Sequence, residues 1–336
     1  MNSRERMINT LHFKAVDRIP RHLWYLPGVA MFRNTELEEL LQNYPNDIEA
    51  PVYKYGTGKR CQGIPHQVGN YIDAWGCKWY VGEPGVIGEV KEPPLIDWSS
   101  LNHYQLPWEL LDEADLSAVG SSCEQSAKFM LAATETRPFE RMQFLRGTEN
   151  LYIDLAYGER QVYRLRDMLQ DFFVKEMEMW ADTAVDGVWF MDDWGSQQSL
   201  LISPNLWREF FKPLYKDYCD ILHRKGKYAF FHSDGHIEAI YPDLIEIGID
   251  ALNSQLFCMD IEKLGHQYAG KIVFWGEIDR QKLLPFGSPQ DVAQAVQRVA
   301  KALLPTEKTG VIAQCEWGVK DPRQNIEAVF AGWELV

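Results

Sequence analysis

The chain has 336 residues, of which 46% are hydrophobic and 13% aromatic, which supports a large buried core and excludes a disordered or low-complexity protein. Asp and Glu number 48 against 34 Lys and Arg, so the net charge of −14 opposes binding to the phosphates of a nucleic acid. No apolar run approaches the roughly 18 residues of a membrane span, and the start MNSRERMINTLHFK is too charged for a signal peptide. We therefore expect a cytoplasmic protein, whose six scattered cysteines are free thiols.

Short apolar or β-branched runs alternate with segments of helical periodicity along most of the chain. Eight runs are predicted to be strands: 19–26, 47–53, 128–133, 187–191, 227–231, 249–253, 271–275 and 310–314. Helix starts are indicated by Ser203 before Pro204, by Ser288 before Pro289, and by a capping box of Thr35 with Glu38. Alternating strands and helices imply parallel pairing, so we predict a (β/α)8 TIM barrel, with an open doubly wound sheet as the alternative.

One segment interrupts this alternation. Residues 71–95 show strand-like alternation around the turn residues Gly82-Glu83-Pro84-Gly85 and are predicted to form a β-hairpin inserted after the second barrel strand. Because no linker or internal repeat divides the chain, we expect a single domain over 1–336 with this insertion.

Polar side chains follow the later predicted strands, at the barrel edge where such folds place their active sites. His232 and Asp234 lie at i, i+2 after the fifth strand and point to the same side, while Cys315 ends the eighth. Imidazole, carboxylate and thiolate are ordinary zinc ligands, which makes the three residues a candidate metal site. The alternative is a hydrogen-bonded His–Asp pair and a buried cysteine that acts as a small apolar residue.

Carboxylates at the same edge are candidates for acid–base catalysis. Asp192 and Asp193 are adjacent, so one is expected to enter the barrel mouth and the other to have a structural role, and the sequence does not say which. Asp234 and Glu277 are further candidates. The candidate substrate-binding residues are His22, Trp194, Gln197, Asn253, Gln255 and Trp317. For each of them, ordinary packing or loop hydrogen bonding is the competing interpretation.

Several well-known catalytic motifs do not occur in the sequence. It contains no GxxxxGK[ST], GxGxxG after a strand, HExxH or GxSxG. Nucleotide hydrolysis, Rossmann redox chemistry, zincin proteolysis and nucleophile-elbow hydrolysis therefore lack their signatures.

Short motifs spread along the whole chain carry a family resemblance. They are Met1-Asn2-Ser3-Arg4-Glu5-Arg6, Asp17-Arg18-Ile19-Pro20, Asp73-Ala74-Trp75-Gly76, Leu145-Arg146-Gly147-Thr148-Glu149, Asp192-Asp193-Trp194-Gly195, Phe231-His232-Ser233-Asp234-Gly235 and Gly276-Glu277-Ile278-Asp279. The sequence resembles the uroporphyrinogen decarboxylase superfamily, especially its branch of corrinoid-dependent methyltransferases. The resemblance implies a (β/α)8 barrel, in agreement with the strand pattern.

The resemblance also separates two branches of that superfamily. True decarboxylases carry an Arg-Gln-Ala-Gly-Arg-Tyr motif after the first strand, whose arginines bind propionates, whereas this chain has Trp24-Tyr25-Leu26-Pro27-Gly28 there. The methyltransferase branch holds zinc through a His-x-Cys pair on the fifth strand and a Cys after the eighth. His232 and Cys315 match two of these positions, so the resemblance implies that they are metal ligands. Asp234 replaces the first cysteine, which implies either a more electrophilic zinc or a site without metal.

These observations predict a methyltransferase component that moves a methyl group between a small methylated substrate, such as a methoxy compound, and the cobalt of a separate corrinoid protein. The chain has no evident corrinoid-binding domain, so the cofactor is expected on a partner protein, with zinc in the barrel. The alternatives are a uroporphyrinogen decarboxylase-type carboxy-lyase and a non-catalytic barrel that binds a tetrapyrrole or a partner. The oligomeric state is not determined by the sequence, and a homodimer stays open.

Overall fold

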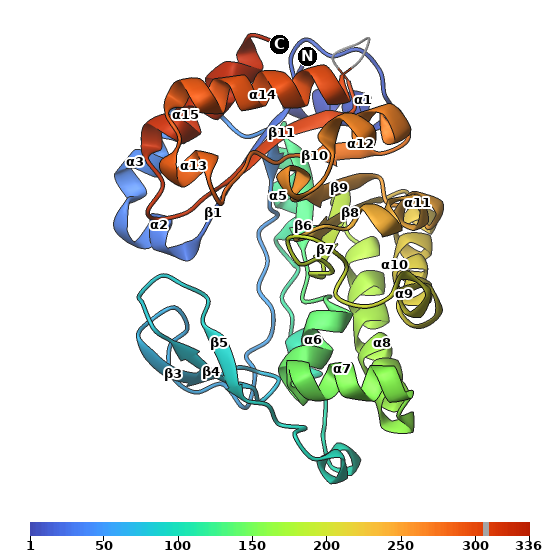
Figure 1. Cartoon of the computed structure of the whole chain (residues 1–336). Helices are drawn as coiled ribbons and strands as arrows, with labels where there is room; N and C mark the ends of the chain where they lie inside the picture. The colour runs from blue at the N-terminus through green and yellow to red at the C-terminus, as the bar shows by residue number, and fades with distance from the viewer. Residues whose placement is uncertain (305–308) are drawn as a thin grey trace.

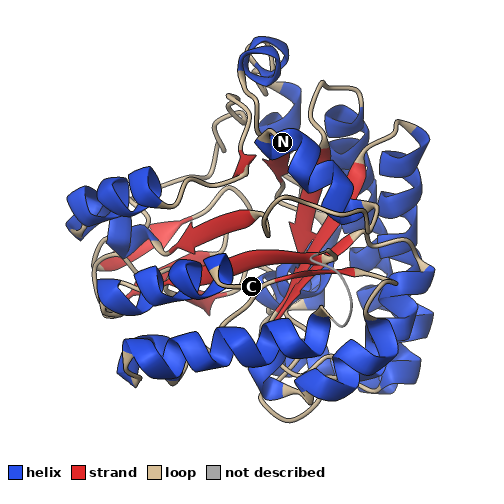
Figure 2. Ribbon diagram, turned by 90° about the horizontal axis from the view of Figure 1, so that it is seen from above, coloured by secondary structure: helices blue, strands red, loops and turns tan. Residues whose placement is uncertain are grey.

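The computed structural model describes residues 1–304 and 309–336, and in these residues eight parallel strands form a nearly closed barrel surrounded by helices (Figures 1 and 2). The barrel strands are β1 (Arg21–Tyr25), β2 (Ile48–Glu49), β6 (Phe129–Ala133), β7 (Gly187–Met191), β8 (Tyr228–Ser233), β9 (Ala251–Ser254), β10 (Val273–Trp275) and β11 (Val311–Trp317). Their order is β1-β11-β10-β9-β8-β7-β6-β2. Each predicted run overlaps one of these strands, and β8, β9 and β11 extend beyond the carboxyl ends of their runs. The predicted fold class is confirmed.

The helices alternate with the strands along the chain. They are α1 (Ser3–Leu11), α2 (Pro27–Phe32), α3 (Asn34–Asn43), α4 (Glu109–Asp112), α5 (Val119–Gln125), α6 (Pro138–Arg146), α7 (Thr148–Tyr157), α8 (Arg160–Ala181), α9 (Pro204–Phe210), α10 (Lys212–Arg224), α11 (Tyr241–Glu246), α12 (Ile261–Tyr268), α13 (Leu283–Phe286), α14 (Pro289–Leu303) and α15 (Arg323–Glu334). Short 3-10 helices lie at Trp98–Asn102, Glu238–Ile240 and Leu256–Cys258.

Backbone and side-chain hydrogen bonds of Asp47 close the barrel between β1 and β2, because β2 has only two residues. The backbone N–H of Asp47 donates to the Arg21 carbonyl across 2.9 Å, and the Asp47 carboxylate accepts from the Arg21 N–H across 2.7 Å. The same buried carboxylate binds the guanidinium groups of Arg6, at 2.6 Å, and Arg18, at 2.7 Å. Arg6 and Arg18 of the N-terminal motifs thus stabilise the barrel, and α1 covers its amino-terminal end with the buried side chains of Met7 and Leu11.

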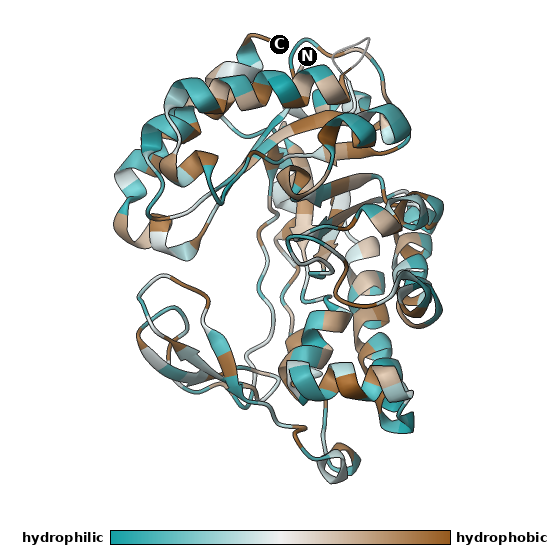
Figure 3. Cartoon of the chain, in the orientation of Figure 1, coloured by the Kyte–Doolittle hydropathy of each residue, from teal (hydrophilic) through white to brown (hydrophobic). Residues whose placement is uncertain are grey.

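The outer helices carry both hydrophilic and hydrophobic residues (Figure 3), and in α14 the buried residues are Val292, Ala295, Val296, Val299, Ala300 and Leu303. The predicted starts at Ser203 and Ser288 are confirmed, since each hydroxyl caps the following helix. The predicted capping box of Thr35 and Glu38 is wrong. The helix α3 begins at Asn34, so Thr35 lies inside it, and its N-cap residue makes no side-chain cap hydrogen bond. No helix within residues 1–304 or 309–336 is long and apolar enough to cross a membrane.

The insertion after β2 contains the predicted hairpin, and a third strand extends it to a three-stranded antiparallel sheet. Its strands are β3 (Gly69–Ile72), β4 (Lys78–Val81) and β5 (Glu89–Glu92), in the order β3-β4-β5 (Figure 1). Residues 69–72 form the extra strand, which a turn at Asp73 joins to β4, since the Asp73 carboxylate accepts the N–H of Cys77. The β4–β5 loop reaches back to α2, where a side chain on Gly85 would collide with the backbone of Gly28.

Candidate functional site

A pocket of about 630 Å³ opens at the carboxyl ends of the barrel strands, and this volume suits a small organic molecule. Its floor is aromatic, with the rings of Trp24 and Trp189 5.0 Å apart above the buried Trp275. Aliphatic side chains of Ile48 and Leu131 complete the apolar part. The polar wall is formed by Arg137, Glu140, Asp193, His232, Asp234, Arg280 and Glu316.

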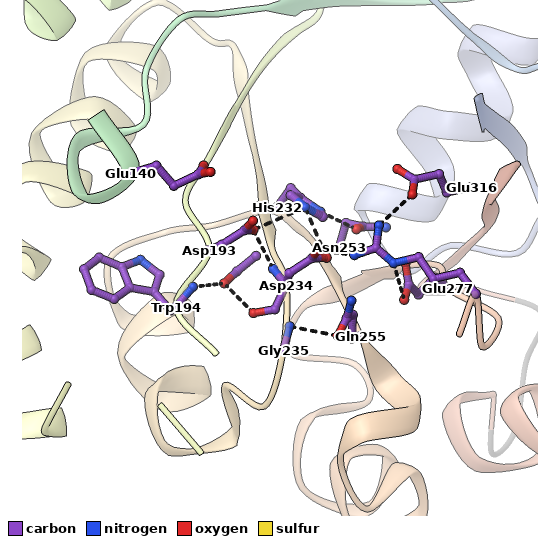
Figure 4. Close-up of polar contacts among 12 residues, drawn as sticks. Glu140, Asp193, Trp194, His232, Asp234, Gly235, Asn253, Gln255, Glu277 and Glu316 are labelled. Atoms are coloured by element: carbon purple, nitrogen blue, oxygen red, sulfur yellow. Dashed lines mark hydrogen bonds and ion pairs between the residues drawn. The ribbon is translucent and has the colours of Figure 1, made fainter. Parts of the chain in front are cut away.

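Three residues of this wall bring metal-ligating atoms together, as Figure 4 shows. The Nε2 atom of His232 lies 3.6 Å from Asp193 Oδ1 and 3.5 Å from Asp234 Oδ1. Ligands bound about 2.0–2.2 Å from a tetrahedral zinc ion are roughly 3.3–3.5 Å apart, so the spacing fits such an ion. The Oδ1 atom of Asp234 is buried and has no hydrogen-bond partner among the described residues, as expected for a carboxylate whose cationic partner is a bound ion.

The orientation of the His232 ring is set by Asn253, which is fully buried on β9. The Asn253 amide nitrogen donates to the carbonyl of Trp275 and to Gln314 Oε1, so its oxygen faces His232. That oxygen lies 2.6 Å from Nδ1, which must therefore carry the hydrogen. In the neutral ring, Nε2 then offers its lone pair to the pocket, which is the arrangement found in histidine ligands of metals.

Arg280 holds the Asp234 carboxylate from the opposite side. It donates to Asp234 Oδ2 and, across 2.6 Å, to Glu316. Asp193 is oriented in a similar way, because its Oδ1 atom accepts the backbone N–H of Asp234 across 2.9 Å. Loss of solvent and the nearby Asp234 carboxylate raise the pKa of Asp193. Both carboxylates of the triad are thus positioned by groups that leave room for a cation between them and His232.

Asp192 and Asp193 have separate environments. Asp192 is fully buried and accepts the N–H groups of Phe139 and Glu140, each across 2.7 Å, and the Tyr215 hydroxyl across 2.6 Å. It therefore caps the amino terminus of α6. Burial raises the pKa of Asp192, and the hydrogen bonds that the carboxylate accepts offset only part of that rise. Asp193 enters the pocket, which resolves the choice that the sequence left open.

Glu140 lies on α6 and points toward Asp193 (Figure 4). Its side chain is 14% exposed and lines the pocket. Burial, and then the Asp193 carboxylate, raise the pKa of Glu140 to about 8. Glu140 is thus a group able to hold a proton beside the metal-ligating cluster near neutral pH.

Cys315 and Trp317 lie away from the pocket, contrary to expectation. On β11 the inward side chains are Gln314 and Glu316, while Cys315 and Trp317 alternate with them and pack in the outer hydrophobic core. Burial strongly raises the pKa of the Cys315 thiol. The structure therefore does not bring Cys315 to His232, and the group of side chains that could hold a metal ion consists of Asp193, His232 and Asp234.

Trp194 is also a core residue and not a wall of the pocket. It is fully buried, stacks on Phe139 with ring centroids 4.1 Å apart, and donates its indole N–H to the Tyr215 hydroxyl. Its neighbours are large apolar side chains beneath the loop after β7, including Trp207 at 6.1 Å. Trp194 was predicted to bind substrate, but the structure supports the alternative interpretation, in which it packs in the core.

Gln197, Gln255 and Glu277 lie together beside a second, much smaller pocket of about 60 Å³. Gln255 Oε1 accepts from the Gly235 N–H and from Gln197, each across 3.1 Å, and so supports the loop that carries Asp234. Glu277 is 4% exposed, with Arg280 Nε 3.8 Å away, and burial raises its pKa well above the usual value. These three residues support the site from outside the barrel-mouth pocket.

His22 does reach the pocket, from β1. Its Nδ1 atom accepts the indole N–H groups of Trp24 and Trp275, each across 3.2 Å, and its ring stacks on Trp275. Nδ1 therefore carries no hydrogen, and the neutral ring presents an Nε2–H. Burial lowers the pKa of His22 to about 3, so the ring stays neutral.

Four charged residues of the pocket were not predicted from the sequence: Arg137, Glu140, Arg280 and Glu316. The first two follow β6, whose polar end Thr134-Glu135-Thr136-Arg137 carries the same kind of signal as the later strand ends. Arg137 and Glu316 lie just after or within strand ends, so the strand pattern alone indicates them. Glu140 lies in the first turn of α6, so the direction of its side chain depends on where that helix begins.

The fold and this polar mouth define an α/β-barrel protein with the layout of an enzyme. The profile of the family described as uroporphyrinogen decarboxylase (URO-D) matches residues 62–332, and the chain belongs to this family. A comparison with solved structures finds a methyltransferase from Methanosarcina mazei, with a TM-score of 0.70, 14% identity, and coverage of 100% of this chain and 99% of that one. A chitinase from Flavobacterium johnsoniae is less similar, with a TM-score of 0.39, 9% identity and 94% coverage of both chains. The comparison with curated proteins finds no match.

Proposed function

We propose that this protein is a methyltransferase component that moves a methyl group between a small methylated substrate and the cobalt of a corrinoid carried by a separate protein. The observation that carries this proposal is the cluster of Asp193, His232 and Asp234 at the mouth of a barrel of the URO-D family. The Methanosarcina mazei methyltransferase, which shares the fold over the full length of both chains, supports it.

The cluster fits zinc by donor chemistry and spacing, and a zinc ion held there would supply positive charge to the substrate atom from which the methyl group leaves. The residues of the chain do the rest. Asn253 selects the tautomer of the neutral His232 ring whose hydrogen is on Nδ1, and Arg280 donates to Asp234 beside it. The aromatic floor of Trp24 and Trp189 excludes water beneath the bound substrate.

A proton must reach the heteroatom that loses the methyl group. Glu140 faces the pocket next to Asp193 and holds its proton near neutral pH, so we assign it as the proton donor. In the balanced reaction, the bond between the heteroatom and the methyl carbon breaks, the reduced cobalt of the corrinoid supplies the electron pair of the new cobalt–carbon bond, and Glu140 protonates the leaving heteroatom.

A carboxy-lyase acting on uroporphyrinogen is the second candidate, since the family profile bears that description. Its substrate carries eight carboxylates. The pocket wall has two arginines, Arg137 and Arg280, and the second is already engaged by Asp234 and Glu316. This cationic content is small for an octacarboxylate, and the methyltransferase is favoured.

The test is methyl transfer to free cob(I)alamin from a panel of methoxyaromatic compounds and methylamines, followed by the loss of cob(I)alamin absorbance. We expect zinc-loaded protein to transfer a methyl group from at least one donor, and His232→Ala to lose roughly two to four orders of magnitude in rate. Arg298→Gln, in an exposed ion pair on α14, is the matched control and keeps the rate. Release of carbon dioxide from uroporphyrinogen, without methyl transfer from any donor, would establish the carboxy-lyase instead.

A further inference from the structure

Arg137 is a cation of the pocket wall whose hydrogen-bond donors lack protein partners. It sits between β6 and α6, and 27% of its side chain is exposed. Its Nε is buried with no hydrogen-bond partner, and its closest acidic atom among the described residues is Glu140 Oε2, 3.7 Å from Nη1 and beyond hydrogen-bond distance. That Glu140 oxygen is itself buried and without a partner. Buried donors without acceptors are costly, so their presence points to an acceptor that the bound state supplies.

The other arginines near the site differ from Arg137. Arg280 is tied to Asp234 and Glu316, and Arg141 donates to Glu135 across 3.1 Å and stacks on Trp75. Each of those arginines donates at least one hydrogen bond within the protein, and Arg141, whose Nε is also buried without a partner, does not line the pocket. Arg137 is therefore distinguished by chemistry as well as by position.

The acids that surround Arg137 are engaged elsewhere. Glu135 accepts from Arg141, Asp192 accepts from the start of α6, and Asp193 belongs to the metal-ligating cluster. None of these three acids forms a hydrogen bond to Arg137, and their charges offset the effect of burial, so that the pKa of its guanidinium is raised. The guanidinium is thus fixed as a cation while its N–H groups stay available.

We propose that Arg137 binds a carboxylate of the substrate, so that the methyl-group carrier handled in this pocket is an organic monocarboxylate with a flat or apolar body. A guanidinium matches a carboxylate in shape and can form two parallel hydrogen bonds with it. The apolar body would rest on Trp24 and Trp189, with its heteroatom toward His232 and the two aspartates. A dianionic phosphate is disfavoured, because the carboxylates of Asp193, Asp234 and Glu316 face the same space.

This inference rests on the proposed function, in that it names the class of molecule which the methyltransferase acts on, yet its test needs no turnover. Isothermal titration of the zinc-loaded full chain is carried out with benzoate, benzamide and phenyl phosphate as probes. We expect benzoate to bind at least tenfold more tightly than benzamide or phenyl phosphate, and Arg137→Gln to weaken benzoate binding roughly ten- to hundredfold while leaving benzamide unchanged. Arg298→Gln is again the matched control and should bind benzoate like the wild type.

Zinc content, measured in the same samples, separates this inference from the proposed function. Loss of benzoate binding in Arg137→Gln with the zinc retained supports the carboxylate site. Equal benzoate affinity in wild type and Arg137→Gln overturns it, since benzoate would then bind elsewhere, including at the metal. Equal binding of benzoate and benzamide by the wild type, or equally tight binding of phenyl phosphate, overturns it as well. If the wild type holds no zinc but still binds benzoate through Arg137, the metal-assisted methyltransferase fails and the carboxylate site stands.

Discussion

The Nδ1 atom of His232 lies 2.6 Å from the side-chain oxygen of Asn253, and this contact directs the unprotonated Nε2 of His232 toward Asp193 and Asp234. Asn253 comes from β9, whereas His232 is on β8 and Asp193 follows β7. Neighbouring parallel strands therefore combine to build the metal-ligating cluster. The same relationship explains why Asn253, although fully buried and out of reach of a substrate, matters to the site.

Replacement of Asn253 by Ala should weaken zinc binding without removing a ligand. The His232 ring would lose the acceptor that sets its tautomer and orientation, a change that typically costs ten- to a hundredfold in metal affinity. Competition with a chromogenic chelator measures the effect, and Asn102→Ala is the control, since Asn102 is exposed and its side-chain oxygen accepts from Arg164, away from the cluster. Unchanged zinc affinity in folded Asn253→Ala would show that the hydrogen bond does not position the ligand.

The adjacent aspartates should give opposite phenotypes. Asp192→Ala leaves two backbone N–H groups of α6 and the Tyr215 hydroxyl without their buried acceptor, so we expect unfolding to become easier by about 3 kcal/mol or more. Asp193→Ala removes a pocket carboxylate, so zinc binding should fall strongly while stability changes by less than about 1 kcal/mol. Urea unfolding and metal analysis of both variants distinguish the two roles. Similar behaviour of the two variants would contradict the separation.

Acid should destabilise the protein partly through His22. Burial lowers the pKa of His22 to about 3, whereas the unfolded ring titrates near 6.5. Because the unfolded chain takes up this proton first, the contribution is complete above about pH 6.5 and is lost as the pH falls toward 3. Gln can accept the indole N–H groups and does not titrate, so His22→Gln should lose on the order of 3 kcal/mol less than the wild type between pH 7 and pH 4. Parallel losses in urea unfolding at the two pH values would refute this assignment.

Much of the fold could be predicted from the sequence, because buried parallel strands consist of short runs of apolar residues. The prediction fails where a single side-chain contact, and not a run of apolar residues, determines the local structure. The run at 47–53 is a strand only at Ile48–Glu49, because Asp47 closes the barrel through its carboxylate. The predicted hairpin lacked its third strand, because Gly69–Ile72 contains Gly and Asn, which weaken the strand signal.

The site could be predicted less completely. His232 and Asp234 share a side because they lie two residues apart, and the structure places both at the pocket. The directions of Asp192 and Asp193 could not be predicted, because both follow the last residue of β7, where the strand no longer determines the facing. Cys315 was proposed from its place at the end of the eighth predicted strand and from the family resemblance, although Gln314 and Glu316 on either side indicate the inward face of β11. The Trp194 side chain has one polar group, the indole N–H. Because the Tyr215 hydroxyl accepts that N–H, Trp194 can be fully buried in the core.

The most direct test of the metal-ligating cluster is the zinc content of purified, zinc-loaded protein after removal of loosely bound metal. Wild type and Cys315→Ala should hold near-stoichiometric zinc, because Cys315 faces the outer core, whereas His232→Ala and Asp234→Ala should lose it. Circular dichroism spectra confirm that each variant is folded. Zinc that depends on Cys315, or that persists in both His232→Ala and Asp234→Ala, would contradict the cluster of Asp193, His232 and Asp234.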